Sequence, residues 1–277
     1  MDEAGIPVNY IAACSGASLV AAAYACGTLP EFKERIFNLS SEELKQYLKR
    51  NGDVGGVFSI DLLEDEIRKY TKGLKFEDVR PLMGFVAVDI ESGEKVLLSM
   101  GDVARAARIS CTLPGVFTPV KWGGRTLVDG GLLTMVPGDF LRQAQVDVTI
   151  GVDMRGTRHI FTDKQITLKR IINFFKKVLL LDSLDSLINK IFGEEEYDGF
   201  KSPKLFEVLG KSLDLAILAN KKNDVEAEAC DLTIVPDAKK LKDIRFTPQS
   251  MRFYYERGRE TGKQYAPKIK EVIKSKG

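Results

Sequence analysis

An α/β fold with a largely parallel central sheet is the class that this sequence predicts. Short apolar runs alternate with helical segments through most of the 277 residues, as in strands joined by crossover helices. Hydrophobic residues make up 44% of the chain, which is ordinary for a protein with a real core. Because no internal repeat or low-complexity linker divides the chain, we expect a single domain over residues 1–277.

Strand and helix signals follow one another over the first part of the chain. Residues 7–12 (PVNYIA) are apolar and extended, and a buried helix should follow over residues 16–26, ended by Gly27. Amphipathic helices are expected over residues 40–50, where SSEE is a capping pattern, and from Ser59 onward. This alternation is what a sheet with crossover helices requires.

Shorter strands are expected in the middle of the chain. Residues 82–90 and 95–99 should form two strands around a glycine turn, and Asp102 should cap the next helix. Residues 125–131 (RTLVDGG) read as a strand that ends in a Gly-Gly turn, and residues 146–154 as a buried strand.

The remaining segments are mainly helical. Residues 160–225 are expected to form a helical excursion, which a short strand (ACDLTIVPD) follows. The charged tail over residues 248–277 should be a helix broken near Gly262 and Pro267. At the start of the chain, MDEAG has the pattern of a helix end with Gly5 as its stop, so we expect the beginning of that element to be missing.

Composition argues against several classes of function. The net charge of +2 gives no sign of nucleic-acid binding, and no apolar run approaches the roughly 18 residues of a membrane span. The short acidic N-terminal run is not a signal peptide. Four cysteines without CxxC spacing indicate reduced thiols in a cytoplasmic protein. Since His159 is the one histidine, an imidazole-rich metal site is not expected, and His159 is the one candidate imidazole base.

Ser15 lies between a strand-like run and an alanine-rich run in IAACSGASLV. A sharp strand-to-helix turn exposes a serine hydroxyl and requires small flanking residues, here Ala13 and Ala17. The backbone N–H of Gly16 would then lie at a helix N-terminus, where an oxyanion is favoured. The pattern also fits a small residue that packs a helix against a sheet, and the turn alone leaves both interpretations open.

Asp129 is the second candidate residue. LVDGGLL places this carboxylate at the end of a strand, and the two glycines leave the space in front of it free. An aspartate here also commonly begins a turn. Because the ends of parallel strands gather at one edge of a sheet, Ser15 and Asp129 should share that edge.

Three stretches together resemble the patatin-like phospholipase family in order and spacing: GIPVNYIAACSGASLVAAAYA, ARAARISCTLPGVFTPV and RTLVDGGLLTMVPGDFLRQAQVDVTIGVDM. The resemblance covers residues 4–155 and implies a three-layer α/β/α fold with a Ser-Asp dyad. The serine of the family's G-x-S-x-G turn falls on Ser15, and the aspartate of its D-G-G/A motif on Asp129. In such a dyad the aspartate activates the serine, which attacks an acyl ester, and water then releases the fatty acid.

The sequence departs from the family pattern in three ways. The turn reads A-C-S-G-A, with alanines in place of both glycines, and Thr134 and Met135 stand where the family often has an Asn pair. The family's first strand and Gly-rich oxyanion loop would precede Met1, so we expect this chain to lack them. The missing loop favours a second interpretation, an inactive member of the fold that binds lipid or a protein partner.

His159 offers an alternative to the dyad, because the order Ser15, Asp129, His159 is that of an α/β-hydrolase triad. Against it, RGTRHI has the composition of a solvated loop. Cys14 and Cys111 could be reactive thiols, although small buried sites are the commoner place for such cysteines.

A basic segment lies within the expected helical excursion. Residues 164–177 interleave apolar residues with five cations and no acid: Lys164, Lys169, Arg170, Lys176 and Lys177. A core helix with a solvated face fits this pattern, and so does an amphipathic helix on an anionic bilayer. The leading hypothesis is a serine hydrolase of phospholipids or other long-chain acyl esters that uses Ser15 and Asp129 and needs no metal and no cofactor. Residues 164–192 would be a peripheral membrane contact.

Overall fold

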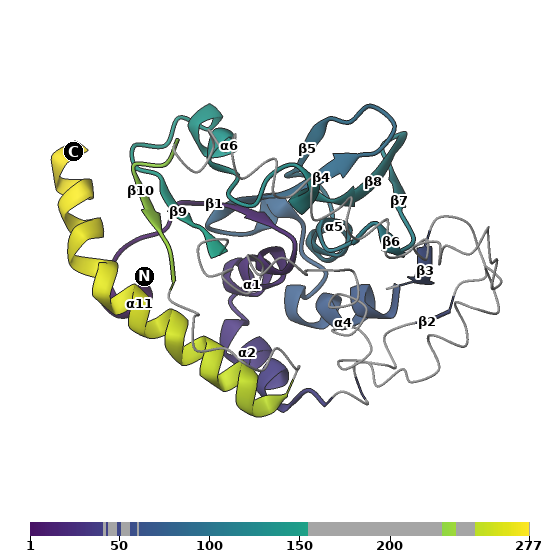
Figure 1. Ribbon diagram of the computed structural model, residues 1–277, viewed down its shortest axis with the longest axis horizontal. Coiled ribbons are helices and arrows are strands. Elements are labelled where there is room, and N and C mark those ends of the chain that lie inside the picture. Colours follow the sequence, from purple (N-terminus) through teal and green to yellow (C-terminus); the bar gives the residue numbers. More distant parts are fainter. Residues whose placement is uncertain are drawn as a thin grey trace, which may run out of the picture.

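The computed structural model describes residues 1–40, 43, 49–50, 56–59, 61–154, 229–236 and 247–276. The largest sheet has five strands, and helices lie against it (Figure 1). The strands are β1 (Tyr10–Cys14), β4 (Leu82–Asp89), β5 (Lys95–Leu98), β7 (Val120–Trp122) and β8 (Arg125–Asp129). The α/β class expected from the sequence is confirmed, and the expected helical excursion lies outside the described residues.

The sheet is mixed, whereas the sequence favoured a mostly parallel one. β1 runs parallel to β4, but β5 and β8 run antiparallel to β4, and β7 runs antiparallel to β8. The connections explain the difference. Between β7 and β8 the chain turns at Gly123 and Gly124, with φ of 57° and 77°. Two successive residues with positive φ make a tight hairpin turn, which leaves its strands antiparallel.

β1 and β8 approach each other end to end along the same side of β4. Val86 pairs with Cys14 of β1 on one side and with β5 on the other. The next residue, Ala87, pairs with Asp129 of β8 and again with β5. Since β5 occupies one side of β4 at both positions, β1 and β8 must share the opposite side. The last residues of these two strands therefore lie at consecutive positions along β4.

Helices α1 (Gly16–Ala25), α4 (Asp61–Thr71) and α5 (Val103–Ser110) pack together against the sheet. Figure 1 shows α6 (Gly138–Gln143) on the other side of β1 from α1. Buried alanines on both α1 and α5 allow these two helices to lie close together over Phe85 of β4. Asp102 caps α5 as expected, accepting a 2.8 Å hydrogen bond from the N–H of Arg105.

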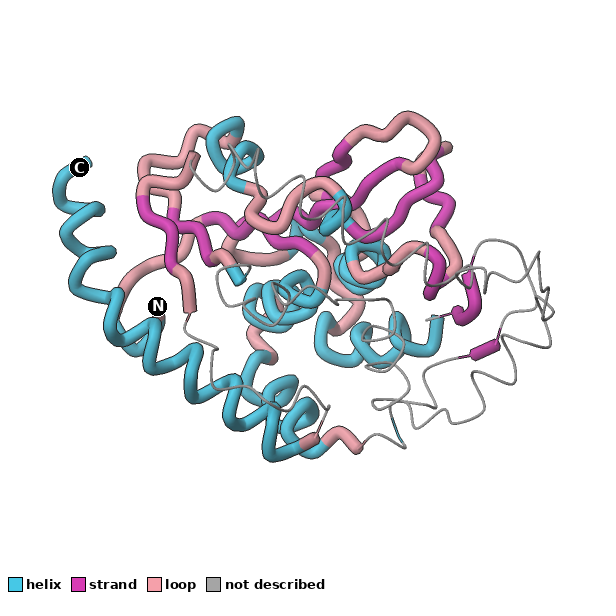
Figure 2. The backbone as a smooth tube through the Cα atoms, in the orientation of Figure 1, coloured by secondary structure: helices cyan, strands magenta, loops and turns pink. Residues whose placement is uncertain are grey.

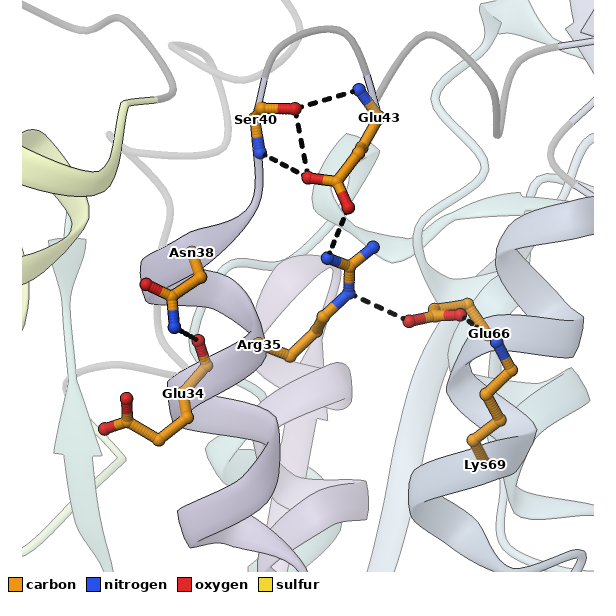
Figure 3. Close-up of polar contacts among 7 residues, drawn as sticks. All are labelled: Glu34, Arg35, Asn38, Ser40, Glu43, Glu66 and Lys69. Atoms are coloured by element: carbon orange, nitrogen blue, oxygen red, sulfur yellow. Dashed lines mark hydrogen bonds and ion pairs between the residues drawn. The ribbon is translucent and has the colours of Figure 1, made fainter.

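Arg35 joins α2 (Leu29–Asn38) to α4 in a polar network (Figure 3). It bonds Glu43 at 2.8 Å and Glu66 at 3.1 Å. Ser40 and Glu43 form the expected capping box, each donating its backbone N–H to the other's side chain. Hydrogen bonds from Ser40 and Arg35 lower the pKa of Glu43 to about 2.

A small three-stranded sheet corrects two of the expected helices. It contains β2 (Lys49–Arg50), β3 (Gly56–Ser59) and β6 (Gly115–Phe117). The last two residues of the helix expected over residues 40–50 lie in β2 instead, and the helix expected from Ser59 begins at Asp61. β3 pairs with β6, far along the chain, and β2 pairs with β3, so these long-range contacts outweigh the local helical pattern.

A second core lies beside the first residues of the chain. β9 (Ile150–Val152) and β10 (Leu232–Ile234) are parallel, and α11 (Pro248–Lys276) packs against β10, with Ile6 and Ile269 buried in this core. The breaks expected near Gly262 and Pro267 are absent from α11. Pro267 removes one hydrogen bond of the helix, but residues on both sides of it pack in the second core and keep the helix continuous. The expected strand over residues 146–154 is shorter than predicted, and Val152 is 52% exposed.

The smoothed backbone in Figure 2 shows α11 as a long helix at the margin of the molecule, with the N-terminal residues beside it. The first of these form a 3-10 turn, η1 (Asp2–Ala4), and Gly5 ends it with φ of 63°. Glu3 accepts a 2.7 Å bond from Arg259 of α11. Within the described ranges, no helix is both long and apolar enough to cross a bilayer.

Candidate active site

Ser15 occupies the turn between β1 and α1 in a rarely populated backbone conformation. Its φ of 55° and ψ of −136° place it where residues with a side chain seldom lie. Such a conformation costs about 1–3 kcal/mol and persists only where the surrounding structure imposes it. Ser15 is partly exposed, and Gly16 and Ala17 after it are exposed. The sharp strand-to-helix turn expected from the sequence is therefore present, and it leaves the serine open to solvent.

The hydroxyl of Ser15 donates a hydrogen bond to Asp129, with 2.6 Å between Oγ and Oδ2. The other carboxylate oxygen, Oδ1, accepts the N–H of Gly131 at 2.8 Å. The two residues meet as predicted, but the predicted reason, a shared edge of a parallel sheet, is wrong. They meet because β1 and β8 run toward each other along β4.

Asp129 is buried, with 5% of its surface exposed. Burial raises the pKa of its carboxyl group, and the hydrogen bonds from Ser15 and Gly131 oppose that shift. No ion pair to Asp129 occurs among the side chains that the structure describes. A carboxylate in this setting is a stronger proton acceptor than an exposed aspartate.

Different contacts exclude a side chain at each of the two glycines after Asp129. A Cβ atom on Gly130 would lie 2.5 Å from the carbonyl oxygen of Val86, so the backbone of β4 excludes any side chain there. A Cβ atom on Gly131 would lie 3.1 Å from Oδ1 of Asp129 and would crowd the carboxylate. Glycine at both positions lets the chain turn closely around Asp129.

Buried polar groups that are not among the site residues predicted from the sequence hold the backbone around Ser15 and Asp129. Ser110 accepts the N–H of Ser15 at 2.9 Å, and Ser18 donates its hydroxyl to the carbonyl oxygen of Ser15 at 2.6 Å. The carbonyl oxygen of Thr112 accepts the N–H of Asp129 at 2.8 Å. All three are fully buried. Their signal in the sequence was a hydroxyl residue within an alanine-rich helical run, or shortly after one.

Gly16 is the first residue of α1. Its backbone N–H has no hydrogen-bond partner among the described residues, as expected for the first turn of a helix. An N–H group at a helix N-terminus favours negative charge, and this one adjoins Ser15.

Cys14 and Cys111 lie near Ser15 without the properties of reactive thiols. The Cys14 thiol is buried and lies 3.3 Å from the carbonyl oxygen of Thr134. Burial, with the Asp129 charge, raises the pKa of Cys14 far above its ordinary value, and the same causes raise the pKa of Cys111 to about 12. Neither sulfur is a thiolate at neutral pH.

Two candidates from the sequence remain untested by the geometry. His159 and residues 164–192 lie outside the described residues. The described part of the chain also contains no group of three or more histidine, cysteine, aspartate or glutamate side chains arranged to hold a metal ion.

The protein thus has an α/β fold with a serine on a strand-to-helix turn, and that serine bonds a buried aspartate. These features place it in the class of α/β proteins with a serine–carboxylate site. The family model of the patatin-like phospholipases matches residues 1–141, and the chain belongs to that family. As a family, the patatin-like phospholipases are lipid acyl hydrolases. The resemblance drawn from the sequence motifs is thus confirmed.

Curated relatives match a little more than half of the chain. An uncharacterized NTE family protein of Mycobacterium tuberculosis is 28% identical over 155 residues, which cover 56% of this chain and 43% of that protein. A second from this organism is 28% identical over 170 residues, covering 57% of this chain and 27% of its own length. An uncharacterized NTE family protein of Mycobacterium bovis is also 28% identical over 155 residues. The match therefore spans less than half the length of these relatives.

Proposed function

We propose that this protein is a serine lipid acyl hydrolase in which Ser15 is the nucleophile and Asp129 is the base. The 2.6 Å hydrogen bond from the Ser15 hydroxyl to the buried carboxylate is the observation that carries the proposal. A serine hydroxyl is a weak nucleophile, and an adjacent base is the usual means of activating it.

In this proposal, Asp129 accepts the Ser15 proton as Oγ attacks the carbonyl carbon of an acyl ester. The negative charge that develops on the carbonyl oxygen is stabilised by the N–H of Gly16 at the start of α1. Asp129 then passes its proton to the departing alcohol, which leaves an ester between the acyl group and Ser15. In the second half, Asp129 takes a proton from water, the hydroxide attacks that ester, and the proton returns to Oγ as the fatty acid departs.

We propose a phospholipid or another long-chain acyl ester as the substrate, on the basis of family membership. No cofactor enters the reaction, because the serine and the aspartate supply both the nucleophile and the proton acceptor. Residues 164–192 are proposed as a peripheral contact with an anionic membrane, on their sequence alone, since residues 164–177 place five cations among apolar residues.

Hydrolysis of a short-chain nitrophenyl ester and of phospholipid vesicles by three variants tests the proposal. Ser15→Ala and Asp129→Asn should each lower turnover by roughly 10²–10⁴-fold, whereas His159→Ala should retain it. Loss of turnover in a His159→Ala variant that still unfolds cooperatively would assign a triad instead. A wild-type protein that binds vesicles and hydrolyses neither substrate would instead support the non-catalytic, lipid-binding interpretation.

A further inference from the structure

We infer that the end of α5 positions Ser15 and Asp129 relative to each other, with Ser110 as the principal positioning residue and Ser18 as its counterpart on α1. The inference rests on the proposed function, because it concerns how the nucleophile and its base are aligned. Neither Ser110 nor Ser18 takes part in the proposed reaction steps.

The direction of the hydrogen bonds at Ser110 follows from elementary chemistry. Its hydroxyl lies 2.7 Å from the carbonyl oxygen of Val86, which can only accept. The single hydroxyl proton of Ser110 is therefore committed to Val86, and its oxygen must accept the N–H of Ser15 at 2.9 Å. Ser110 thus ties the nucleophile to the position on β4 where β1 ends.

Ser18 fixes the other polar group of the Ser15 backbone. Its hydroxyl lies 2.6 Å from the carbonyl oxygen of Ser15 and 3.3 Å from that of Ala107, so its proton is directed mainly to Ser15. The N–H of Ser18 also donates to the Ser15 carbonyl, at 2.9 Å. Both backbone groups of Ser15 are therefore held by buried hydroxyls, as the rare conformation of this residue requires.

The same short segment also holds the base. Two residues after Ser110, the carbonyl oxygen of Thr112 accepts the N–H of Asp129 at 2.8 Å. Ser110 and Thr112 therefore bind the backbones of Ser15 and Asp129 from one end of one helix. Loss of either bond would let one reacting residue move with respect to the other, and small misplacements of reacting groups cost up to about a hundredfold in rate.

The variants Ser110→Ala and Ser18→Ala test the inference, with Thr28→Val as the matched control. The Thr28 hydroxyl donates to the carbonyl oxygen of Tyr70 at 2.7 Å, which is also a hydroxyl-to-carbonyl bond, and no hydrogen bond joins it to Ser15. Three quantities are measured in each variant: kcat and KM on a soluble nitrophenyl ester, the melting temperature, and hydrogen exchange of the Ser15 amide by NMR.

Ser110→Ala should lower kcat by about ten- to a hundredfold with KM unchanged, and should accelerate exchange of the Ser15 amide. Ser18→Ala should act in the same direction but less, because the Ser18 N–H still binds the same carbonyl. Ser110→Thr, which keeps a hydroxyl, should restore most of kcat. Thr28→Val should lower the melting temperature while kcat stays within about twofold of wild type.

Unchanged kcat and unchanged Ser15 amide exchange in Ser110→Ala would overturn the inference. If Ser110→Ala does not fold, Ser18→Ala decides the question: a kcat no lower than that of Thr28→Val would overturn it. If the wild-type protein hydrolyses no ester, the proposed function fails, whereas amide exchange still shows whether Ser110 holds Ser15.

Discussion

The Ser15 hydroxyl and the Asp129 carboxylate are 2.6 Å apart across 114 residues of sequence. Their separation is set by β4, where Val86 pairs with the last residue of β1 and Ala87 pairs with Asp129 itself. The serine on the turn after β1 therefore faces the carboxylate at the end of β8. The ionised carboxylate of Asp129 lowers the stability of the folded protein, because burial opposes its ionisation.

Asp129→Asn should raise stability at neutral pH while it removes activity. The pKa of Asp129 is higher in the folded protein than in the unfolded chain. Its contribution to the free energy of unfolding is therefore fully present below the ordinary aspartate pKa of about 3.9, and it is lost as pH rises through the raised pKa. The melting temperature of the variant should exceed that of wild type at neutral pH, and the gap should close as pH falls.

Glu43→Gln is the control of opposite sign. The pKa of Glu43 is lowered to about 2, so its contribution to stability is present above the ordinary glutamate pKa of about 4.3 and is lost as pH falls toward 2. This variant should melt below wild type at neutral pH. An Asp129→Asn variant that also melts below wild type would contradict the assigned desolvation of the carboxylate.

Ester hydrolysis should increase with pH through the raised pKa of Asp129, because only the ionised carboxylate accepts the Ser15 proton. The profile of kcat against pH should therefore have its acid limb above the ordinary aspartate range. The same limb should persist in His159→Ala. Its disappearance in that variant would assign the titration to the histidine.

Gly130→Ala should destabilise the protein by roughly 1–3 kcal/mol, since the new Cβ atom would lie 2.5 Å from the backbone oxygen of Val86. Gly16→Ala provides the comparison, because no atom lies within 4 Å of a Cβ there. Its stability should remain within about 0.5 kcal/mol of wild type. Denaturant unfolding measures both, and equal losses would contradict the close approach of β4 to the chain at Gly130.

Vesicle binding should depend on the basic segment. Changing four of its cations to Gln should weaken binding to anionic vesicles, because each contributes about 1 kcal/mol near such a surface; they are Lys169, Arg170, Lys176 and Lys177. The loss should be greatest at low salt, where screening is weakest, and turnover of a soluble ester should survive. Binding that is unchanged in cosedimentation would instead indicate a core helix with a solvated face.

Local patterns predicted the elements whose signals are contained within a few residues. The Asp102 cap, the β4–β5 hairpin and the turn at Ser15 are of this kind. The end-to-end arrangement of β1 and β8 could not be predicted in this way, because it depends on their register against β4, far from both in sequence. The break predicted at Pro267 was wrong because packing along α11 outweighs the local preference.

Ser18 and Ser110 were missed for a related reason. A buried hydroxyl in an alanine-rich helix has no distinctive spacing, and its importance depends on which backbone groups lie opposite. Ser15 and Asp129 were selected because each adjoins residues that a tight turn requires, and a family resemblance connected them. Their catalytic roles remain predictions.

Covalent labelling with a fluorophosphonate probe tests the central claim most directly. Such a probe reacts with an activated serine hydroxyl, which displaces fluoride and forms a stable bond to phosphorus. The account predicts one adduct, located on Ser15 by peptide mass spectrometry, absent in Ser15→Ala and formed far more slowly in Asp129→Asn. Absence of an adduct in the folded wild-type protein, or an adduct on another residue that Ser15→Ala retains, would contradict it.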